Sequence, residues 1–263
     1  MSLSDKNLSY INIVKDKAIA WLTLDRPPAN AFHYEMYHQL YDAFQILDND
    51  DEVRVIIIKA TGKIFSAGND INEFASGRKE RADGIPASEI TELSLSSVLR
   101  SPKPVISLVN GAACGSGFCL VSYSDIVIAS DKARFGIPEI KRGVVGGAPE
   151  AAFSLPPKLT RYLALTGELI DAKWALRAGL VSFIVPEEEL LNAGKRTAEQ
   201  ILANPPITVS LMKQSLANIY PPNAVAKLIS DDEPRYLASM ASEDFKEAAA
   251  AFLQKRAPDY QGR

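Results

Sequence analysis

Two loops built from small residues are the segments of this sequence best suited to chemistry. Phe65–Asp70 has the sequence Phe-Ser-Ala-Gly-Asn-Asp, and Asn110–Gly117 has the sequence Asn-Gly-Ala-Ala-Cys-Gly-Ser-Gly. Each follows an expected strand and leads toward a helix start, where backbone N–H groups point outward without partners. Small residues let a ligand approach that backbone closely. If the two loops converge, two amide donors meet one oxygen atom and form an oxyanion hole; taken singly, each loop is equally typical of a tight turn.

Nucleophilic hydrolysis does not fit the pattern. Ser116 lies in Cys114–Phe118, which lacks the flanking glycines of a hydrolase nucleophile elbow. The only histidines available as a base, His33 and His38, belong to or adjoin one amphipathic segment, where a surface position is expected. The sequence therefore predicts no catalytic triad.

Phosphate and metal sites are equally poorly supported. Gly115 and Gly117 resemble the start of a dinucleotide-binding loop, but Leu120 occupies the third glycine position. Cys114 and Cys119 provide neither a disulfide framework nor, with two isolated histidines, a metal site. We expect both cysteines to be buried and reduced.

Composition limits the class of protein further. The chain has 263 residues, 47% hydrophobic and 23% charged, and a formal net charge of −3. These values are typical of a globular protein with one large domain or slightly more. The longest apolar runs, such as Val55–Ile58, are far shorter than the roughly 20 residues of a membrane span. A near-neutral balance disfavours nucleic acid as a partner, and no signal peptide is apparent, so we expect a cytoplasmic protein without membrane contact.

Hydrophobic periodicity predicts an α/β protein. Strands are expected over residues 10–14, 18–24, 53–59, 105–109, 126–129, 133–135 and 181–185, and helices over 34–47, 87–99, 158–166 and 172–178. The first two strands form a hairpin, and the alternation of the others with helices favours parallel pairing. Residues 76–86 are expected to form a loop.

The C-terminal part has a different character. From Glu187 onward the pattern is helical, with breaks expected at Pro205-Pro206, Pro221-Pro222 and Pro234. We therefore expect a core over residues 1–186 and a helical region over residues 187–263. Large apolar residues of this region point to an interface: Leu237, Met240, Phe245, Phe252 and Leu253.

Together the motifs resemble the crotonase (enoyl-CoA hydratase/isomerase) superfamily. The two loops, followed by Ser124–Ala129 and Phe135–Ile140, have the order and spacing of that family. The resemblance extends over residues 10–256 and includes Arg26–Ala31, Thr166-Gly167, Ala172–Leu180 and Phe245–Arg256. It implies a ClpP/crotonase ββα superhelix core with a C-terminal helical trimerisation region, assembled as a homotrimer or a dimer of trimers. It also implies coenzyme A as part of a thioester substrate, with no tightly bound cofactor.

The resemblance assigns roles to single positions. The backbone N–H groups of Asn69 and Ser116 are implied as the two oxyanion donors. Substrate contacts are implied for Ala67, Gly68, Asp70, Ile71, Gly115, Cys119 and Lys255. Of these, Ala67, Asp70 and Ile71 correspond to the adenine end of coenzyme A, although helix capping is the preferred role for Asp70. Lys255 would lie near the coenzyme A phosphates.

The two glutamate positions of the family narrow the choice of reaction. Hydratases of the family carry two, and Glu139 occupies one position whereas Cys119 occupies the other. A thiol does not substitute for a water-orienting carboxylate, so we expect 3,2-enoyl-CoA isomerisation with Glu139 as the proton shuttle. The alternatives are a hydratase or another lyase of the family, and a catalytically idle protein that binds acyl-CoA or a partner. Glu150 is a second candidate acid or base, or a first-turn residue favoured by its helix dipole.

Overall fold

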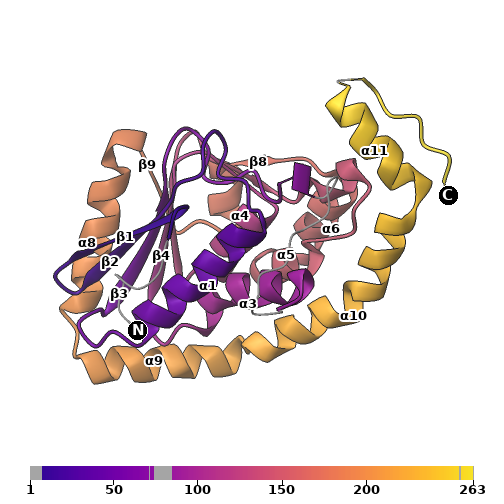
Figure 1. Cartoon of the computed structure of the whole chain (residues 1–263). Helices are drawn as coiled ribbons and strands as arrows, with labels where there is room; N and C mark the ends of the chain where they lie inside the picture. Colours follow the sequence, from indigo (N-terminus) through magenta and orange to yellow (C-terminus); the bar gives the residue numbers. More distant parts are fainter. Residues whose placement is uncertain (1–7, 71, 74–84, 255, 263) are drawn as a thin grey trace.

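The computed structural model describes residues 8–70, 72–73, 85–254 and 256–262 (Figure 1). Ile71 and Lys255, both implied as substrate contacts, lie outside the described residues. The expected loop over residues 76–86 also lies outside them, except for its last two residues.

A six-stranded sheet forms the centre of the molecule, in the order β1-β2-β3-β4-β6-β9. Its strands are β1 (Ile11–Asp16), β2 (Ile19–Leu24), β3 (Val55–Ala60), β4 (Val105–Val109), β6 (Ile126–Ser130) and β9 (Phe183–Val185). β1 and β2 pair antiparallel, which confirms the expected hairpin, and every other pairing is parallel. Parallel neighbours require crossover connections, and helical segments lie in the chain between each pair of parallel neighbours in this sheet.

Helices cover both faces of the sheet (Figure 1). One face packs against α1 (Tyr34–Asp48), α3 (Ala87–Arg100) and α4 (Ser116–Tyr123), and the other packs against α8 (Leu190–Leu202). Within β3, Ile56 and Ile58 belong to the first core, whereas Val55 and Ile57 belong to the second. Successive strand residues point to opposite faces, which explains why this strand is apolar throughout.

A second, three-stranded sheet lies beside the first. It contains β5 (Ala112–Cys114), β7 (Arg134–Gly136) and β8 (Ile170–Asp171), with β5 parallel to β7 and β8 antiparallel to it. The sequence analysis treated Asn110–Gly117 as one loop, and this was wrong, because β5 and the start of α4 lie inside it. β5 forms through pairing with β7, about twenty residues away, which local composition does not reveal.

Short helices complete the core, and longer ones form the C-terminal region. They are the 3-10 helices Pro138–Arg142 and Glu187–Glu189, then α5 (Ala148–Ser154), α6 (Pro157–Thr166), α7 (Ala172–Ala178), α9 (Pro206–Ile219), α10 (Pro222–Ala241) and α11 (Glu243–Leu253). Prolines begin α9 and α10, as expected, but Pro234 does not break α10. Pro234 removes one N–H donor, yet the helix continues through it over 20 residues.

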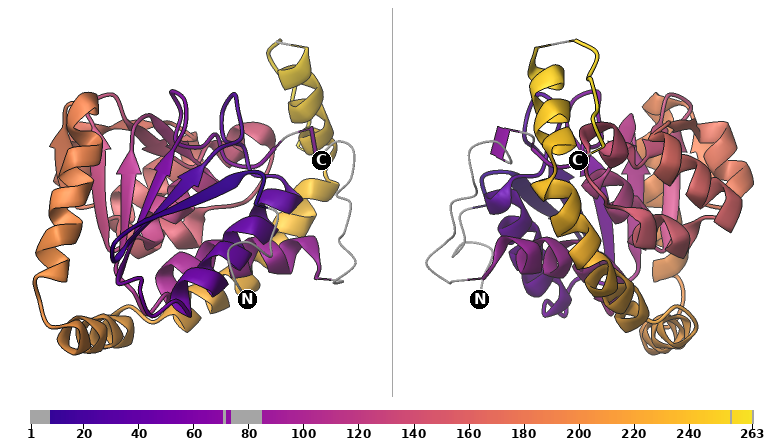
Figure 2. Two further views of the ribbon diagram at one scale, coloured as in Figure 1. Left: turned by 60° about the vertical axis from the view of Figure 1, so that its left-hand side comes forward. Right: turned by 90° about the vertical axis from the view of Figure 1, so that its right-hand side faces the viewer.

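The helices α9 and α10 run along one edge of the core, and α11 projects beyond it (Figures 1 and 2). In the described part of the chain, no helix has the length and hydropathy needed to cross a membrane.

Backbone contacts fix the two small-residue loops to each other. Ser66 pairs with Ala113 in an isolated parallel bridge. The Ser66 N–H donates to the Ala112 carbonyl at 3.0 Å, and the Cys114 N–H donates to the Ser66 carbonyl at 2.9 Å. At Gly111, a Cβ atom would lie only 2.0 Å from the Lys63 carbonyl oxygen. The chain at Gly111 therefore tolerates only hydrogen as a side chain.

We expect Gly111→Ala to lower the free energy of unfolding by about 3 kcal/mol, because the added methyl group forces two backbone segments apart. Gly179→Ala is the matched control: its φ is +85° and nothing lies within 4 Å of its Cβ position. That control should cost about 1 kcal/mol through backbone strain alone. Urea denaturation measures both, and equal losses would contradict this account of the loop contact.

Candidate active site

The two loops meet at a pair of glycines. A Cβ atom on Gly68 would lie 3.0 Å from the Cys114 carbonyl oxygen and 3.4 Å from the Gly115 Cα. Both glycines have positive φ, +89° and +52°, a conformation that other residues rarely adopt. Gly68 and Gly115 therefore allow a backbone approach that brings the following residues, Asn69 and Ser116, to one place.

The backbone N–H groups of Asn69 and Ser116 donate no hydrogen bond to any residue that the structure describes. Ser116 is the first residue of α4, where an N–H has no partner within the helix. Both residues line one cavity of about 740 Å³. The structure thus brings together two free amide donors at a ligand-sized cavity, as an oxyanion hole requires.

The side chains of the same two residues are tied to a tyrosine. The Tyr37 hydroxyl, on α1, donates to Asn69 Oδ1 and lies 2.5 Å from Ser116 Oγ. Ser116 Oγ is also 3.4 Å from Asn69 Oδ1. These contacts join the two loops through their side chains and leave the backbone donors for a ligand. The sequence analysis placed Tyr37 only on the apolar face of a helix, and the one signal it missed is the polar hydroxyl on that face.

Glu139 lies directly against the second loop. It follows β7 on a 3-10 helix, and a Cβ atom on Gly115 would lie 2.3 Å from its Oε1. Its Oε2 is inaccessible to solvent and has no hydrogen-bond partner among the described residues. Burial raises the pKa of Glu139 to about 7, and the negative charge of Glu150 adds to the effect. A carboxyl group with this pKa can both accept and return a proton near neutral pH.

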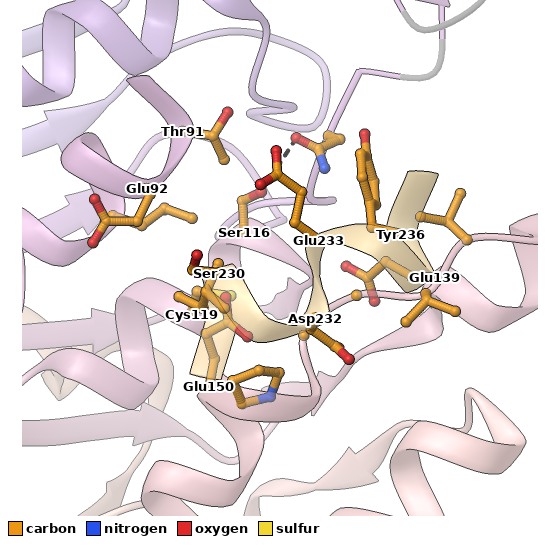
Figure 3. A pocket seen from close by; sticks show the side chains of 18 of the residues that line it. Thr91, Glu92, Ser116, Cys119, Glu139, Glu150, Ser230, Asp232, Glu233 and Tyr236 are labelled. Carbon is orange, nitrogen blue, oxygen red and sulfur yellow. Dashed lines mark hydrogen bonds between the residues drawn. The ribbon is translucent and has the colours of Figure 1, made fainter. Parts of the chain in front are cut away.

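Glu150 lies in the same cavity, with Cys119 beside it (Figure 3). It is 9% exposed, and its Oε2 has no hydrogen-bond partner in the described part of the chain. Burial raises the pKa of Glu150, and the nearby Asp232 adds repulsion, while a hydrogen bond with the Cys119 thiol works in the opposite direction. The sequence left Glu150 between a site role and a first-turn role, and the structure shows its side chain in the cavity.

Cys119 itself is a buried, neutral thiol. Burial and the charges of Glu150 and Glu139 raise its pKa well above the usual range. A thiol in this state is a poor nucleophile and acts here as a hydrogen-bond partner of Glu150. Both Cys119 and Cys114 are free and buried, as the sequence predicted.

Two further residues from the sequence analysis lie beside this cavity without lining it. Ala67 is exposed, and its N–H donates to the Ala29 carbonyl. Asp70 binds Arg26 at 2.6 Å and accepts the Asn72 N–H at 2.9 Å. Burial disfavours the charged form of Asp70, but these hydrogen bonds outweigh it and lower its pKa. Asp70 is therefore held as an anion by its own chain.

The surface position expected for the histidines is wrong for His38. It is 2% exposed, and its ring packs edge-on against Tyr34 with centroids 4.6 Å apart. The His38 side chain faces the core because α1 is buried over a wider surface than its stripe of large apolar residues. Among the described residues, no group of three His, Cys, Asp or Glu side chains could hold a metal ion.

Comparison with known proteins agrees with this geometry. The family model described as "Enoyl-CoA hydratase/isomerase" matches residues 14–263. The chain belongs to this family. It is 33% identical over 266 residues to a carnitinyl-CoA dehydratase of Salmonella typhi, covering 96% of this chain and 98% of that protein.

Solved structures give the same result for the fold. The enoyl-CoA hydratase/isomerase of Pseudoalteromonas atlantica T6c superposes with a TM-score of 0.88 at 29% identity, over 96% of this chain and all of that one. The carnitinyl-CoA hydratase of Mycobacterium avium gives 0.86 at 31% identity, over 97% and 99%. The crotonase fold expected from the sequence is confirmed, and the chain is an acyl-CoA enzyme of this family.

The buried Glu139 should make the stability of the protein depend on pH. Its pKa is about 7 in the folded state against 4.5 ordinarily, so the folded state binds more protons between these values. The free energy of unfolding therefore falls as pH rises from about 4.5 to 7. Because glutamine does not titrate, Glu139→Gln should gain on the order of 2 kcal/mol relative to the wild type between pH 5 and pH 8. Urea denaturation at both pH values measures this, and a difference independent of pH contradicts the burial of a titrating Glu139.

Proposed function

We propose that this enzyme transfers a proton within the acyl group of a coenzyme A thioester, through an enolate that the Asn69 and Ser116 amides stabilise. The observation that supports this most is the position of Glu139. Its buried carboxyl group, with an oxygen that has no partner, lies against Gly115 in the loop that carries the Ser116 amide. A base beside two free donors is the arrangement that removal of a proton next to a thioester carbonyl requires.

Isomerisation of a 3-enoyl-CoA to a 2-enoyl-CoA is the reaction that one such base completes. The Glu139 carboxylate removes a proton from carbon 2, and the electron pair of the broken C–H bond moves onto the thioester oxygen. The two backbone N–H groups stabilise that oxyanion. The protonated Glu139 returns the proton to carbon 4 as the double bond moves to carbons 2 and 3. Atoms and charge balance without any further reagent.

Hydration and its reverse, dehydration, form the second candidate. Glu150 favours it, because it brings a second buried carboxyl group to the place beside Cys119. In that case one of the two groups, Glu139 or Glu150, acts as the base that activates water, and the other acts as the acid. Relatives named carnitinyl-CoA dehydratase and hydratase are consistent with this candidate.

The two reactions are separated by assays with 3-enoyl-CoA, 2-enoyl-CoA and 3-hydroxyacyl-CoA thioesters. We expect Glu139→Gln to lose at least about 100-fold in kcat for whichever reaction the wild type catalyses, because an amide does not accept the proton. Glu168→Gln, an exposed residue paired with Lys141, is the control and should keep full activity. A loss below tenfold in Glu139→Gln places the base elsewhere, and a wild-type protein inactive on all three thioesters supports an idle acyl-CoA-binding protein instead.

The pH dependence of the reaction follows from the same group. The base form of Glu139 prevails above its pKa of about 7, so kcat/KM should fall about tenfold per pH unit well below pH 7. A profile that stays flat down to pH 5 contradicts Glu139 as the base. Measuring at constant ionic strength keeps the charge of coenzyme A from dominating the comparison.

We also propose that the C-terminal helices assemble the protein as a homotrimer or a dimer of trimers. The support is apolar exposure on α9, where Ile207, Leu211 and Ile219 are 75%, 58% and 64% exposed. Clusters of this kind usually mark an interface. Farther along, Leu237, Phe252 and Leu253 are also exposed, whereas Met240 lines the cavity.

The double variant Ile207→Glu, Leu211→Glu should dissociate the assembly, because it places two charges in an apolar contact. Val14→Glu, at a residue 54% exposed on β1, is the control for the added charge. Sedimentation velocity gives the mass of each species. A double variant that sediments like the wild type removes α9 from the interface.

A further inference from the structure

The two residues that carry the free N–H donors have side chains that commonly bind such donors themselves. Asn and Ser oxygens accept hydrogen bonds from nearby backbone N–H groups at turns and at helix starts. Ser116 begins α4, and Asn69 lies in the loop that faces it. A side-chain oxygen of either residue on one of the free N–H groups would take the place of the thioester oxygen. The active site therefore needs a group that holds these side chains away from the donors.

The Tyr37 hydroxyl binds both side-chain oxygens. It donates to Asn69 Oδ1 and lies 2.5 Å from Ser116 Oγ. Because a hydroxyl has one proton, Ser116 Oγ is the donor in the second contact. A chain of hydrogen bonds thus leads from Ser116 through Tyr37 to Asn69. It directs both side chains toward α1 and leaves their backbone N–H groups to the cavity.

Packing fixes the position of this hydroxyl. Tyr37 is completely buried, and its ring contacts that of Phe32 with the centroids 5.0 Å apart. Phe32 is in turn bound to the first loop. Its N–H donates to the Gly68 carbonyl at 2.7 Å, and its carbonyl accepts the Asp70 N–H at 2.8 Å. The ring and the loop that carries Asn69 therefore form one unit.

The Asn69 side chain lies close to the second donor as well as to its own. Its Oδ1 is 3.4 Å from Ser116 Oγ, an atom of the residue whose N–H is free. Without the Tyr37 hydroxyl, both side chains lose a hydrogen-bond partner, and a polar group removed from water without a partner is unfavourable. The free backbone N–H groups are then available to replace the lost bonds.

Resting on the proposed function, we infer that Tyr37 is a positioning residue whose hydroxyl keeps the Asn69 and Ser116 side chains off the two backbone N–H groups. Asn69 and Ser116 line the cavity, with Ser116 labelled in Figure 3, whereas Tyr37 is not among the lining residues. Tyr37 therefore acts through those two side chains and not on the substrate. This role has a consequence that joining the loops does not have: activity lost with the hydroxyl returns when both side-chain oxygens are removed.

The first test is Tyr37→Phe, which removes the hydroxyl and keeps the ring. We expect kcat to fall at least about tenfold, because loss of one oxyanion donor costs on the order of 100- to 1,000-fold. The affinity for an unreactive saturated acyl-CoA should change by less than about threefold, since the donors act mainly on charge that develops in the transition state. Steady-state kinetics and calorimetric titration measure the two quantities.

Tyr34→Phe is the matched control for this substitution. Tyr34 is a buried tyrosine of the same helix, and its hydroxyl donates to the Ile85 carbonyl at 2.6 Å. The control loses a hydrogen bond of similar length away from both loops, so its kcat should stay within about twofold of the wild type. A kcat in Tyr37→Phe equal to that of the control overturns the inference.

The second test removes the two side-chain oxygens. The variant Asn69→Ala, Ser116→Ala retains both backbone N–H groups, and adding Tyr37→Phe to it should change kcat by less than about threefold. The triple variant should also be at least about threefold more active than Tyr37→Phe alone. A hydroxyl that only stabilised the fold would give no such recovery. A triple variant no more active than Tyr37→Phe overturns the inference.

A binding measurement separates this inference from the proposed function. In an acyl-CoA with a nitronate next to the thioester carbonyl, the negative charge is shared with the thioester oxygen, so its affinity reports on the same donors without turnover. Tyr37→Phe should weaken binding at least about tenfold, and the triple variant should recover it. That result in a protein inactive on every thioester supports the inference while the proposed reaction fails, and equal affinities overturn it. Turnover that Glu139→Gln abolishes and Tyr37→Phe leaves intact supports the proposed function and overturns the inference.

Discussion

The close backbone contact between Phe65–Asp70 and Asn110–Gly117 is the constraint on which the site depends. The bridge between Ser66 and Ala113 joins the loops, and glycines at the point of contact leave no room for a side chain. Parallel strands bring such loops to one edge of a sheet because their carboxyl ends lie together. Two N–H donors thus reach one cavity, although neither loop could hold its donor there alone.

The acidic cavity beside these donors has an energetic cost in the free protein. The Oε2 atoms of Glu139 and Glu150 are both buried and lack a partner among the described residues, and such groups destabilise a fold unless a ligand or a proton compensates them. Sites of this kind exchange stability for function. On this account the substrate provides what the fold lacks: an oxyanion for the free amides and a proton for Glu139.

Much of this structure could be predicted from the sequence, because it follows from local patterns. Alternating apolar residues predicted the hairpin, and apolar residues spaced three to four apart predicted α1. The nearly continuous apolar run in Val53–Lys59 indicated a strand covered on both faces. The rest depends on contacts between distant segments. β5 exists only through its pairing with β7, and the Tyr37 hydroxyl reaches Asn69 and Ser116 only when α1 lies over both loops.

The central claim is that the Asn69 and Ser116 amides bind the thioester oxygen beside Glu139. A crystal structure of the protein with a bound unreactive acyl-CoA analogue tests it most directly. The account predicts the thioester oxygen at about 2.7–3.1 Å from both backbone nitrogens, with a Glu139 carboxylate oxygen next to carbon 2 of the acyl chain. A thioester oxygen hydrogen-bonded elsewhere, with both amides facing water, would contradict it.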